Sequence, residues 1–231
     1  MSRGKAIVNL LNLEKDEELA TVLDVPSFDP GSYIIMATKN GLVKKTDLMA
    51  YSRPRVGGII ALSLVEGDEL ISARITDGTR NVFLGSVEGK SIRFHESDVR
   101  AAGRVSQGVR GMRLSAGDKI VGMEVMSHGQ TLVTATQNGF GKRTSIDAYP
   151  IQKRGGMGVI TIKTNARNGK VISILLVEED DDLMLMTDIG KIIRMPIKGI
   201  SVISRNTQGV TLIDIEEGER VVGAARLAEK E

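Results

Sequence analysis

The chain has 231 residues, of which 41% are hydrophobic and 26% charged, and its formal net charge is +2. This length and composition are typical of a folded protein with one large domain or two small ones, and they exclude an intrinsically disordered chain. The absence of cysteine excludes disulfides, thiolate metal sites and cysteine nucleophiles, and it fits a reducing cytosol.

The first predicted element is half of a unit that repeats later in the chain. Strands are predicted at residues 6–11 and 19–25, with an acidic turn at 14–18 between them. The apolar run that follows Arg3 and Lys5 is too short for a signal peptide, and no later run could span a bilayer. We therefore expect an unprocessed cytoplasmic protein that does not associate with membranes.

Four full units follow, and each begins with a predicted hairpin. Residues 33–46 contain a β-rich run, the turn pair Asn40-Gly41 and a second run with two lysines, a pattern typical of a β-hairpin. The turn glycines recur at positions 41, 89, 139 and 190, so the period is 48 to 51 residues. The second half of each unit contains two further predicted strands, at 58–64 and 70–75, 111–114 and 120–125, 158–162 and 171–177, and 209–215 and 221–227.

A period near 50 residues with four strands per unit indicates an all-β fold of propeller-type blades, with about four and a half repeats present. The absence of long 3.6-residue periodicity excludes helical solenoids, whereas two adjacent β-sandwiches remain an alternative. We expect a single domain over residues 1–231. Its predicted parts are a half blade at 1–30 and blades at about 31–79, 80–129, 130–180 and 181–231. The amino-terminal edge would be closed by strand exchange, left open, or completed by residues absent from this chain.

Positive charge concentrates in four equivalent windows. Residues 41–58, 89–111 and 139–158 each carry a net charge of +3, and residues 190–209 carry +4. Together the windows carry +13, so the rest of the chain carries −11. Equivalent positions of successive blades lie at equivalent places on a disc, so the windows predict a basic band that suits a long polyanion. Each window taken alone could instead be a solvated face whose lysines protect sheet edges from pairing.

The loop from Gln152 to Gly158 joins a basic pair to three glycines in four positions. Glycine reaches positive φ and allows a close backbone approach, so Lys153 and Arg154 could meet a phosphate together with backbone N–H groups. The alternative is a basic strand connection that binds nothing. The recurrence of related loops along the chain favours binding.

Candidates for catalysis are weak. His95 and His128 have no acidic or histidine partner at ligand spacing, and the three tyrosines have no acid–base groups around them. The acidic run at 178–182 lacks the alternating spacing of a calcium loop, and the phosphate-binding pattern Gly-x-x-x-x-Gly-Lys-Ser/Thr is absent. With no tryptophan and only seven Phe or Tyr residues, little is available to stack unpaired bases. We expect no catalytic residue, no metal and no cofactor.

Residues 135–144, 205–210 and 107–111, together with 7–11, resemble the C-terminal domain of the DNA gyrase A protein. The resemblance runs over essentially the whole chain and is closer than that to the topoisomerase IV counterpart. It implies a β-pinwheel, a propeller-like disc of usually six blades that exchange strands with their neighbours. It also implies that the basic perimeter wraps duplex DNA, which gives gyrase the handed crossing needed for negative supercoiling.

The hallmark of that family is the gyrase A box, with the pattern Gln-Arg/Lys-Arg-Gly-Gly-Arg/Lys-Gly, usually in the first blade. Met157 replaces one cation of this pattern here, and the register places this copy in a late blade. We expect the first blade, half of the second and the primary box to lie outside this chain. The DNA-cleaving tyrosine of the family belongs to another domain, so no enzymatic activity is expected of this one. The matching residues are Gln152, Lys153, Arg154, Gly155, Gly156 and Gly158.

The resemblance and the charge pattern together predict sequence-tolerant binding, bending and wrapping of duplex DNA by a monomeric domain. Its implied partners in the intact enzyme are the rest of the gyrase A protein and the gyrase B protein. The alternatives are the corresponding domain of topoisomerase IV, a propeller scaffold that binds acidic proteins, and a propeller enzyme with a central site, for which no converging acids or histidines are evident. The expected DNA-binding residues are Arg3, Lys5, Lys44, Lys45, Arg53, Arg55, Lys90, Arg93, Arg104, Arg110, Lys142, Arg143, Lys153, Arg154, Lys191, Arg194 and Arg205.

Overall fold

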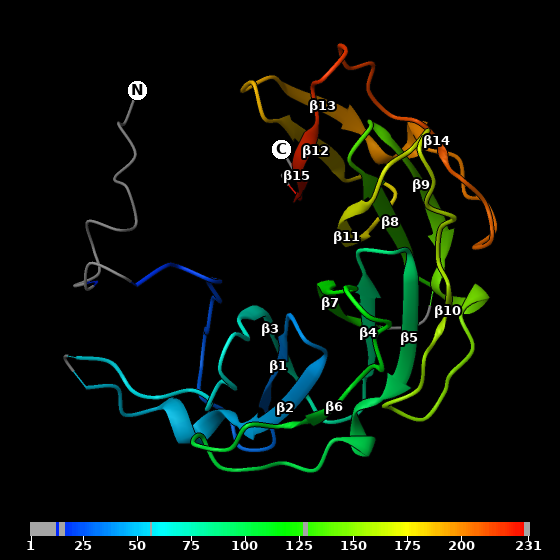
Figure 1. Cartoon of the computed structure of the whole chain (residues 1–231). Coiled ribbons are helices and arrows are strands. Elements are labelled where there is room, and N and C mark those ends of the chain that lie inside the picture. The colour runs from blue at the N-terminus through cyan, green and yellow to red at the C-terminus, as the bar shows by residue number, and fades with distance from the viewer. Residues whose placement is uncertain (1–12, 14–16, 56, 127–128, 229–231) are drawn as a thin grey trace.

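The computed structural model describes residues 13, 17–55, 57–126 and 129–228. These residues form four antiparallel sheets that follow one another along an open arc (Figure 1). The predicted all-β class with four-stranded blades is confirmed. Helical structure in the described residues is limited to short 3-10 turns, η2 (Leu48–Tyr51), η3 (Glu96–Asp98), η4 (Ile146–Ala148) and η5 (Ile197–Gly199).

Each sheet is built around a hairpin and an inner strand. The hairpins are β1 (Tyr33–Thr38) with β2 (Leu42–Asp47), β4 (Asn81–Ser86) with β5 (Lys90–His95), β8 (Thr131–Thr136) with β9 (Phe140–Ser145), and β12 (Asp182–Thr187) with β13 (Ile192–Pro196). The inner strands are β3 (Leu70–Thr76), β7 (Ile120–Met126), β11 (Val171–Val177) and β15 (Val221–Leu227).

The fourth strand of a sheet comes from the following repeat. Three crossover strands of two residues leave their own repeat and pair with the outer hairpin strand of the preceding sheet: β6 (Val109–Arg110) with β2, β10 (Val159–Ile160) with β5, and β14 (Val210–Thr211) with β9. Strand exchange therefore links each of the first three sheets to the next repeat.

A glycine precedes each crossover strand because the backbone passes very close to the strand below it. Gly158 has a φ of +70°, and a Cβ on it would stand 2.1 Å from the carbonyl oxygen of Ser91. Gly108 and Gly209 also have positive φ, and their Cβ atoms would stand 2.6 Å from backbone oxygens. No side chain fits such a contact, so glycine is required at these positions.

Some predicted strands differ from those observed. The strands expected at 111–114, 158–162 and 209–215 are shorter and shifted, and pairing is confined to residues 109–110, 159–160 and 210–211. The structure assigns no strand to 19–25 or to 58–64. Their equivalents in later repeats pair with a hairpin of their own or of the preceding repeat, and the described residues contain no hairpin before β1, so these two segments have no ladder to join there. The strand expected at 6–11 lies outside the described residues.

The hydrophobic core lies between the sheets, so each blade is stabilised by its neighbours. Ile35 and Val43 of the first sheet pack against Leu84 and Phe94 of the second, and these four side chains are at most 1% exposed. The inner strands also contact one another in series, β3 with β7, β7 with β11, and β11 with β15. Both faces of an internal sheet are therefore buried, which removes the usual alternation of buried and exposed residues along its strands.

The two ends of the arc differ. Leu23 and Val25 cover the outward face of the first sheet, where they contact a cluster that includes Ile34 and Met36. The fourth sheet has only three strands among the described residues, in the order β13-β12-β15, so the outer edge of β13 is unpaired there. Within the described residues, none of the helices has the length and apolar character needed to cross a bilayer.

Candidate nucleic-acid interface

The structure divides the expected DNA-binding cations into three groups, with Arg3 and Lys5 outside the described residues. Six are exposed: Arg53, Arg55, Arg110, Lys153, Lys191 and Arg194. Four are partly exposed: Lys90, Arg104, Arg154 and Arg205. Five are buried: Lys44, Lys45, Arg93, Lys142 and Arg143.

Lys44 and Lys142 occupy equivalent positions in β2 and β9 and hold the crossover loops in place. The amine of Lys44 donates to the carbonyl oxygens of Ala61, at 2.7 Å, and Arg104. Burial, with a smaller contribution from the charge of Arg104, lowers the pKa of Lys44 to about 8. These contacts place the lysine under the loop that carries Arg104 and not on the surface.

Lys142, two blades after Lys44, makes the equivalent contacts with the next crossover loop but one. Its amine donates to the carbonyl oxygens of Ser204, at 2.7 Å, and Arg205. Burial, with a smaller contribution from the charge of Arg205, lowers the pKa of Lys142 to about 7. A buried amine of this kind can satisfy backbone carbonyls that would otherwise lack partners.

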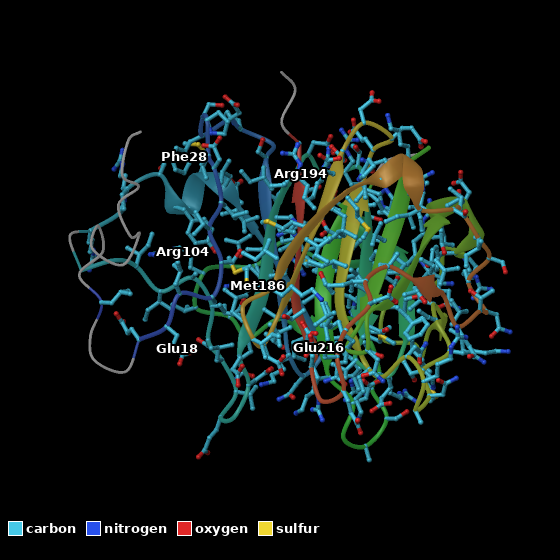
Figure 2. All side chains as sticks on the ribbon, turned by 90° about the horizontal axis from the view of Figure 1, so that it is seen from above. Glu18, Phe28, Arg104, Met186, Arg194 and Glu216 are labelled. Atoms are coloured by element: carbon cyan, nitrogen blue, oxygen red, sulfur yellow. The ribbon has the colours of Figure 1, made fainter. Side chains whose placement is uncertain are left out.

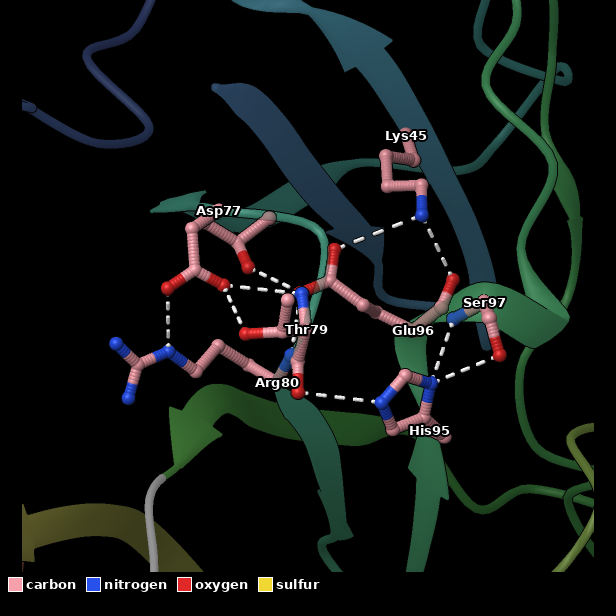
Figure 3. Close-up of polar contacts among 8 residues, drawn as sticks. Lys45, Asp77, Thr79, Arg80, His95, Glu96 and Ser97 are labelled. Carbon is pink, nitrogen blue, oxygen red and sulfur yellow. Dashed lines mark hydrogen bonds and ion pairs between the residues drawn. The ribbon is translucent and has the colours of Figure 1, made fainter. Parts of the chain in front are cut away.

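Lys45 follows Lys44 and reaches into the next blade. Its Nζ atom donates to the carbonyl oxygen of Glu96 at 2.9 Å and lies 3.5 Å from the Glu96 carboxylate (Figure 3). That carboxylate is fully buried and also accepts from the hydroxyl of Thr76 and from the Arg80 N–H, at 2.8 Å. The neighbouring His95 contacts Ser97 at 2.8 Å, so its ring belongs to the same structural turn.

Arg93 and Arg143 occupy the position equivalent to Lys45. Arg93 donates to the carbonyl oxygen of Ile146 at 2.8 Å and to that of Tyr149 at 3.2 Å, which ties β5 to the 3-10 turn of the third blade. Arg143 pairs with Glu179 at 2.6 Å. The expectation that these side chains face DNA is therefore corrected for all five buried cations, because neighbouring blades or loops cover them and their nitrogens bond inside the protein.

Three partly exposed arginines form a repeating contact along the perimeter. Each precedes a positive-φ crossover glycine by four residues and donates to the carbonyl oxygen of the crossover segment one repeat earlier. A guanidinium has five N–H groups in a planar fork, so the nitrogens that remain can still meet phosphate. The distances are 3.4 Å from Arg104 to Ile60, 3.1 Å from Arg154 to Arg110 and 2.8 Å from Arg205 to Ile160.

Two backbone N–H groups of the loop from Gln152 to Gly158 already have partners inside the protein. The N–H of Gln152 donates to Arg93 at 2.8 Å, and that of Gly155 to Gly111 at 2.6 Å. The side chain of Lys153 is 91% exposed and lies 3.1 Å from the Asp98 carboxylate. A phosphate at this loop can therefore meet the Lys153 side chain but not the N–H groups of Gln152 and Gly155.

Sequence reasoning missed two exposed cations. Arg113 and Lys163 each lie five residues after a crossover glycine, and their N–H groups donate to Gly156 and Thr207 at 2.8 Å. Each is therefore beside a perimeter loop. The signal was available in the repeat, because both cations lie at the same distance along the chain from the crossover glycine of their repeat.

Other site types find no support among the described residues. There is no group of three or more acidic or histidine side chains placed to hold a metal ion in that part of the chain. In the acidic run at 178–182, the Asp181 carboxylate accepts the Glu178 N–H at 2.6 Å and pairs with Arg226 at 2.7 Å. These contacts make the run a structural turn.

Comparison with known proteins identifies a family that matches this chain. Residues 32–77, 80–126, 130–178 and 181–228 match the family described as DNA gyrase C-terminal domain, beta-propeller. The DNA gyrase A protein of Escherichia coli (strain K12) is 48% identical over 228 residues, which cover 99% of this chain and 26% of that protein. The chain thus spans about a quarter of the length of this relative.

Two solved structures share the fold. The C-terminal domain of DNA topoisomerase IV superposes with a TM-score of 0.89 at 28% identity, over 96% of this chain and 70% of that one. The DNA gyrase A C-terminal domain gives 0.87 at 25% identity, over 98% of this chain and 76% of that one. The fold therefore does not separate the two enzymes, whereas the 48% sequence identity favours gyrase over topoisomerase IV.

Proposed function

Because the chain belongs to the DNA gyrase C-terminal domain family, we propose that it binds duplex DNA along its outer perimeter and bends it. In this proposal the domain is the accessory DNA-wrapping part of a type IIA topoisomerase and works with the rest of the gyrase A protein and with the gyrase B protein in the cytoplasm. It has no catalytic role of its own.

The observation that carries the proposal is the repetition of partly exposed arginines along the crossover loops. Arg104, Arg154 and Arg205 stand at equivalent positions of three successive loops and are fixed there by contacts to the preceding crossover segment. Positive groups repeated along an arc can neutralise phosphates at successive places on a duplex that follows the arc. Further exposed cations in the four basic windows or within five residues of them are Arg53, Arg55, Arg100, Arg110, Arg113, Lys153, Lys163, Lys191, Arg194 and Lys198.

The mechanism is electrostatic positioning. Each phosphate neutralised by a lysine or arginine releases counterions, so affinity falls by about 0.9 log units per log unit of salt for each contact. Bending a 20 to 30 base-pair site by 40 to 90° costs about 1 to 6 kcal/mol, which several contacts spread along the arc can offset. Backbone contacts carry little sequence information, so binding tolerates sequence and prefers flexible sites.

A length series of duplex DNA tests the proposal. Affinity and bend angle, measured by fluorescence anisotropy and by end-to-end energy transfer, should rise with duplex length until the arc is filled. Weak binding that does not depend on length, with no bend, would contradict wrapping and favour a scaffold for acidic proteins. A steep salt dependence for long duplexes and a shallow one for short duplexes would support the proposal.

A further inference from the structure

The loop from Gln152 to Gly158 differs from the other two crossover loops in the residue that lies beneath it. Three residues after the turn glycine, the first blade has Lys44 and the third has Lys142, and each lysine donates to a carbonyl oxygen of the loop above it. The second blade has Ile92 at this position, which has no group to donate. A Cβ on Gly156 would lie 3.5 Å from the Cδ1 atom of Ile92, so the isoleucine packs under this loop without bonding to it.

Asp98 holds this loop instead, through contacts with both of its cations. Its carboxylate lies 3.1 Å from the Nζ atom of Lys153, and its carbonyl oxygen accepts from the Nε atom of Arg154 at 2.7 Å. Asp98 belongs to η3, which follows β5, so the contacts join the second blade to the crossover loop of the following repeat. One residue thus binds both side chains that the proposed function assigns to phosphate at this loop.

The carboxylate at this place is a feature of the second blade. Nine residues after the turn glycine, the other three blades have small residues, Ala50, Ala148 and Gly199. Lys153 is likewise an addition, since the other two loops have Gly103 and Ser204 at its position. The arginine that follows is common to all three loops, and Figure 2 marks it on the first of them as Arg104. With two cations and one carboxylate, this loop has the same net charge at these positions as the other two.

The three side chains line a hollow of about 300 Å³ at the perimeter. The side chain of Lys153 is 91% exposed and that of Asp98 is 17% exposed, so the amine can turn toward solvent while the carboxylate stays in place. The guanidinium of Arg154 is held by the carbonyl oxygens of Asp98 and Arg110, and its five N–H groups allow it to meet an anion as well. A phosphate in this hollow would meet both cations, but Lys153 already has a carboxylate as its partner.

We propose that Asp98 competes with DNA phosphate for Lys153 and so weakens the DNA contact of this loop, an inference that rests on the proposed function. A phosphate and a carboxylate on the same amine would repel each other, so the phosphate must displace the carboxylate. The carbonyl oxygen of Asp98 keeps its bond to Arg154 during this exchange. The loop therefore holds its position while Lys153 changes partner, and Asp98 sets how tightly this part of the perimeter binds.

A double-mutant cycle in DNA binding tests the proposal. Asp98→Asn removes the charge and keeps the carbonyl oxygen that holds Arg154, and Asp98→Ala introduces the side chain that the first and third blades have at this position. By fluorescence anisotropy, each variant should bind duplex DNA about three- to fivefold more tightly than wild type, near the upper end of the range for an exposed ion pair. In a Lys153→Ala background the gain should fall below about 1.5-fold, because the carboxylate no longer has a cation to hold.

The cycle separates competition from a general effect of charge. Glu66→Gln is the matched control, because it removes one exposed carboxylate from a turn in another blade, and it should leave the affinity unchanged. An equal gain with and without Lys153 would show that Asp98 acts only by repelling DNA at a distance, and the proposal would be wrong. Unchanged or weaker binding by both Asp98 variants would also overturn it. Thermal unfolding of each variant verifies that the fold is retained.

Inorganic phosphate gives a second readout that needs no DNA. It is titrated at constant ionic strength into protein with isotope-labelled lysine, and the NMR signal of the Lys153 side chain reports binding. The dissociation constant should be about three- to fivefold lower for Asp98→Asn than for wild type. This result, combined with no DNA binding by any variant, would contradict the proposed function and leave the competition intact. Equal constants for wild type and Asp98→Asn would overturn the role of Asp98.

Discussion

The amine of Lys142 lies 2.7 Å from the carbonyl oxygen of Ser204, under a perimeter loop of the next repeat. The loop continues into Arg205, whose guanidinium donates to Ile160 at 2.8 Å. A buried cation therefore sets the position of an exposed one. Inside this fold, positive charge fixes the shape of the perimeter loops, and in the proposed function positive charge on the outside binds DNA.

Lys142→Met should destabilise the fold and loosen this loop. Methionine fills similar volume but leaves the carbonyl oxygens of Ser204 and Arg205 without their donor, which costs about 1 to 3 kcal/mol. Urea denaturation followed by circular dichroism measures the loss. Lys163→Met, at an exposed perimeter site, is the matched control and should change stability by no more than about 0.5 kcal/mol. Equal losses in both variants would contradict a structural role for Lys142.

The pH dependence of stability should also report on Lys142. Its pKa is about 7 in the folded chain, compared with an ordinary value of 10.5. Between these values the unfolded chain binds a proton that the folded chain has released, so stability rises with pH above about 7. The slope is at most about 1.4 kcal/mol per pH unit. Urea titrations from about pH 6.5 to 9.5 should show wild type gaining on Lys142→Met. A difference that stays constant over this range would contradict the lowered pKa.

Lys153→Ala and Arg154→Ala should separate binding from folding. Lys153 is 91% exposed, so its loss should lower the salt slope of DNA binding by about 0.9 and leave stability unchanged. Arg154 also donates to Asp98 at 2.7 Å and to Arg110 at 3.1 Å, so its loss should in addition destabilise the fold by about 1 kcal/mol. Anisotropy titrations at several salt concentrations and urea denaturation give the two readouts. An unchanged slope for Lys153→Ala would move the contact to another loop.

Met157→Lys should strengthen DNA binding. Met157 is 49% exposed on the loop that resembles the gyrase A box, so a lysine there can reach solvent without disturbing the core. One added phosphate contact should steepen the salt slope by about 0.9. Met157→Gln, which adds polarity without charge, is the control and should leave the slope unchanged. A lysine variant with wild-type slope would show that DNA does not pass over this position.

Gly158→Ala should be far more destabilising than Gly218→Ala. Both glycines have positive φ, but a Cβ on Gly158 would stand 2.1 Å from the Ser91 oxygen, whereas one on Gly218 has nothing described within 4 Å. Gly218→Ala should cost about 1 to 2 kcal/mol from backbone conformation alone. Gly158→Ala must also displace the crossover strand, and its thermal unfolding temperature should fall well below that of Gly218→Ala. Similar unfolding temperatures would contradict the close approach.

Periodicity was sufficient to predict the repeats and the hairpins. The turn glycines Gly41, Gly89, Gly139 and Gly190 mark the hairpin turns, because each φ is positive and only local backbone geometry is involved. The crossover strands were placed in the right region but given the wrong length. Their pairing depends on how far a neighbouring sheet extends, which a local pattern does not contain.

The DNA-facing cations were predicted less well than the fold, because every charged side chain in the basic windows was expected to be exposed to solvent. Lys44 and Lys45 lie in a strand that is buried on both faces, so their nitrogens bond inside the protein. The sequence carried a signal for this, since both lysines fall within a strand of a radial repeat whose blades cover one another. Cations in loops, such as Lys153, are exposed as expected, because loops lie at the perimeter.

Strand exchange also sets an order of events during synthesis on the ribosome. β2 ends at Asp47, but its outer edge is completed only by Val109. At about 5 to 20 residues per second, the roughly 60 residues between them take on the order of 3 to 12 s to emerge. Each of the first three blades therefore has one open edge until the following repeat has been translated.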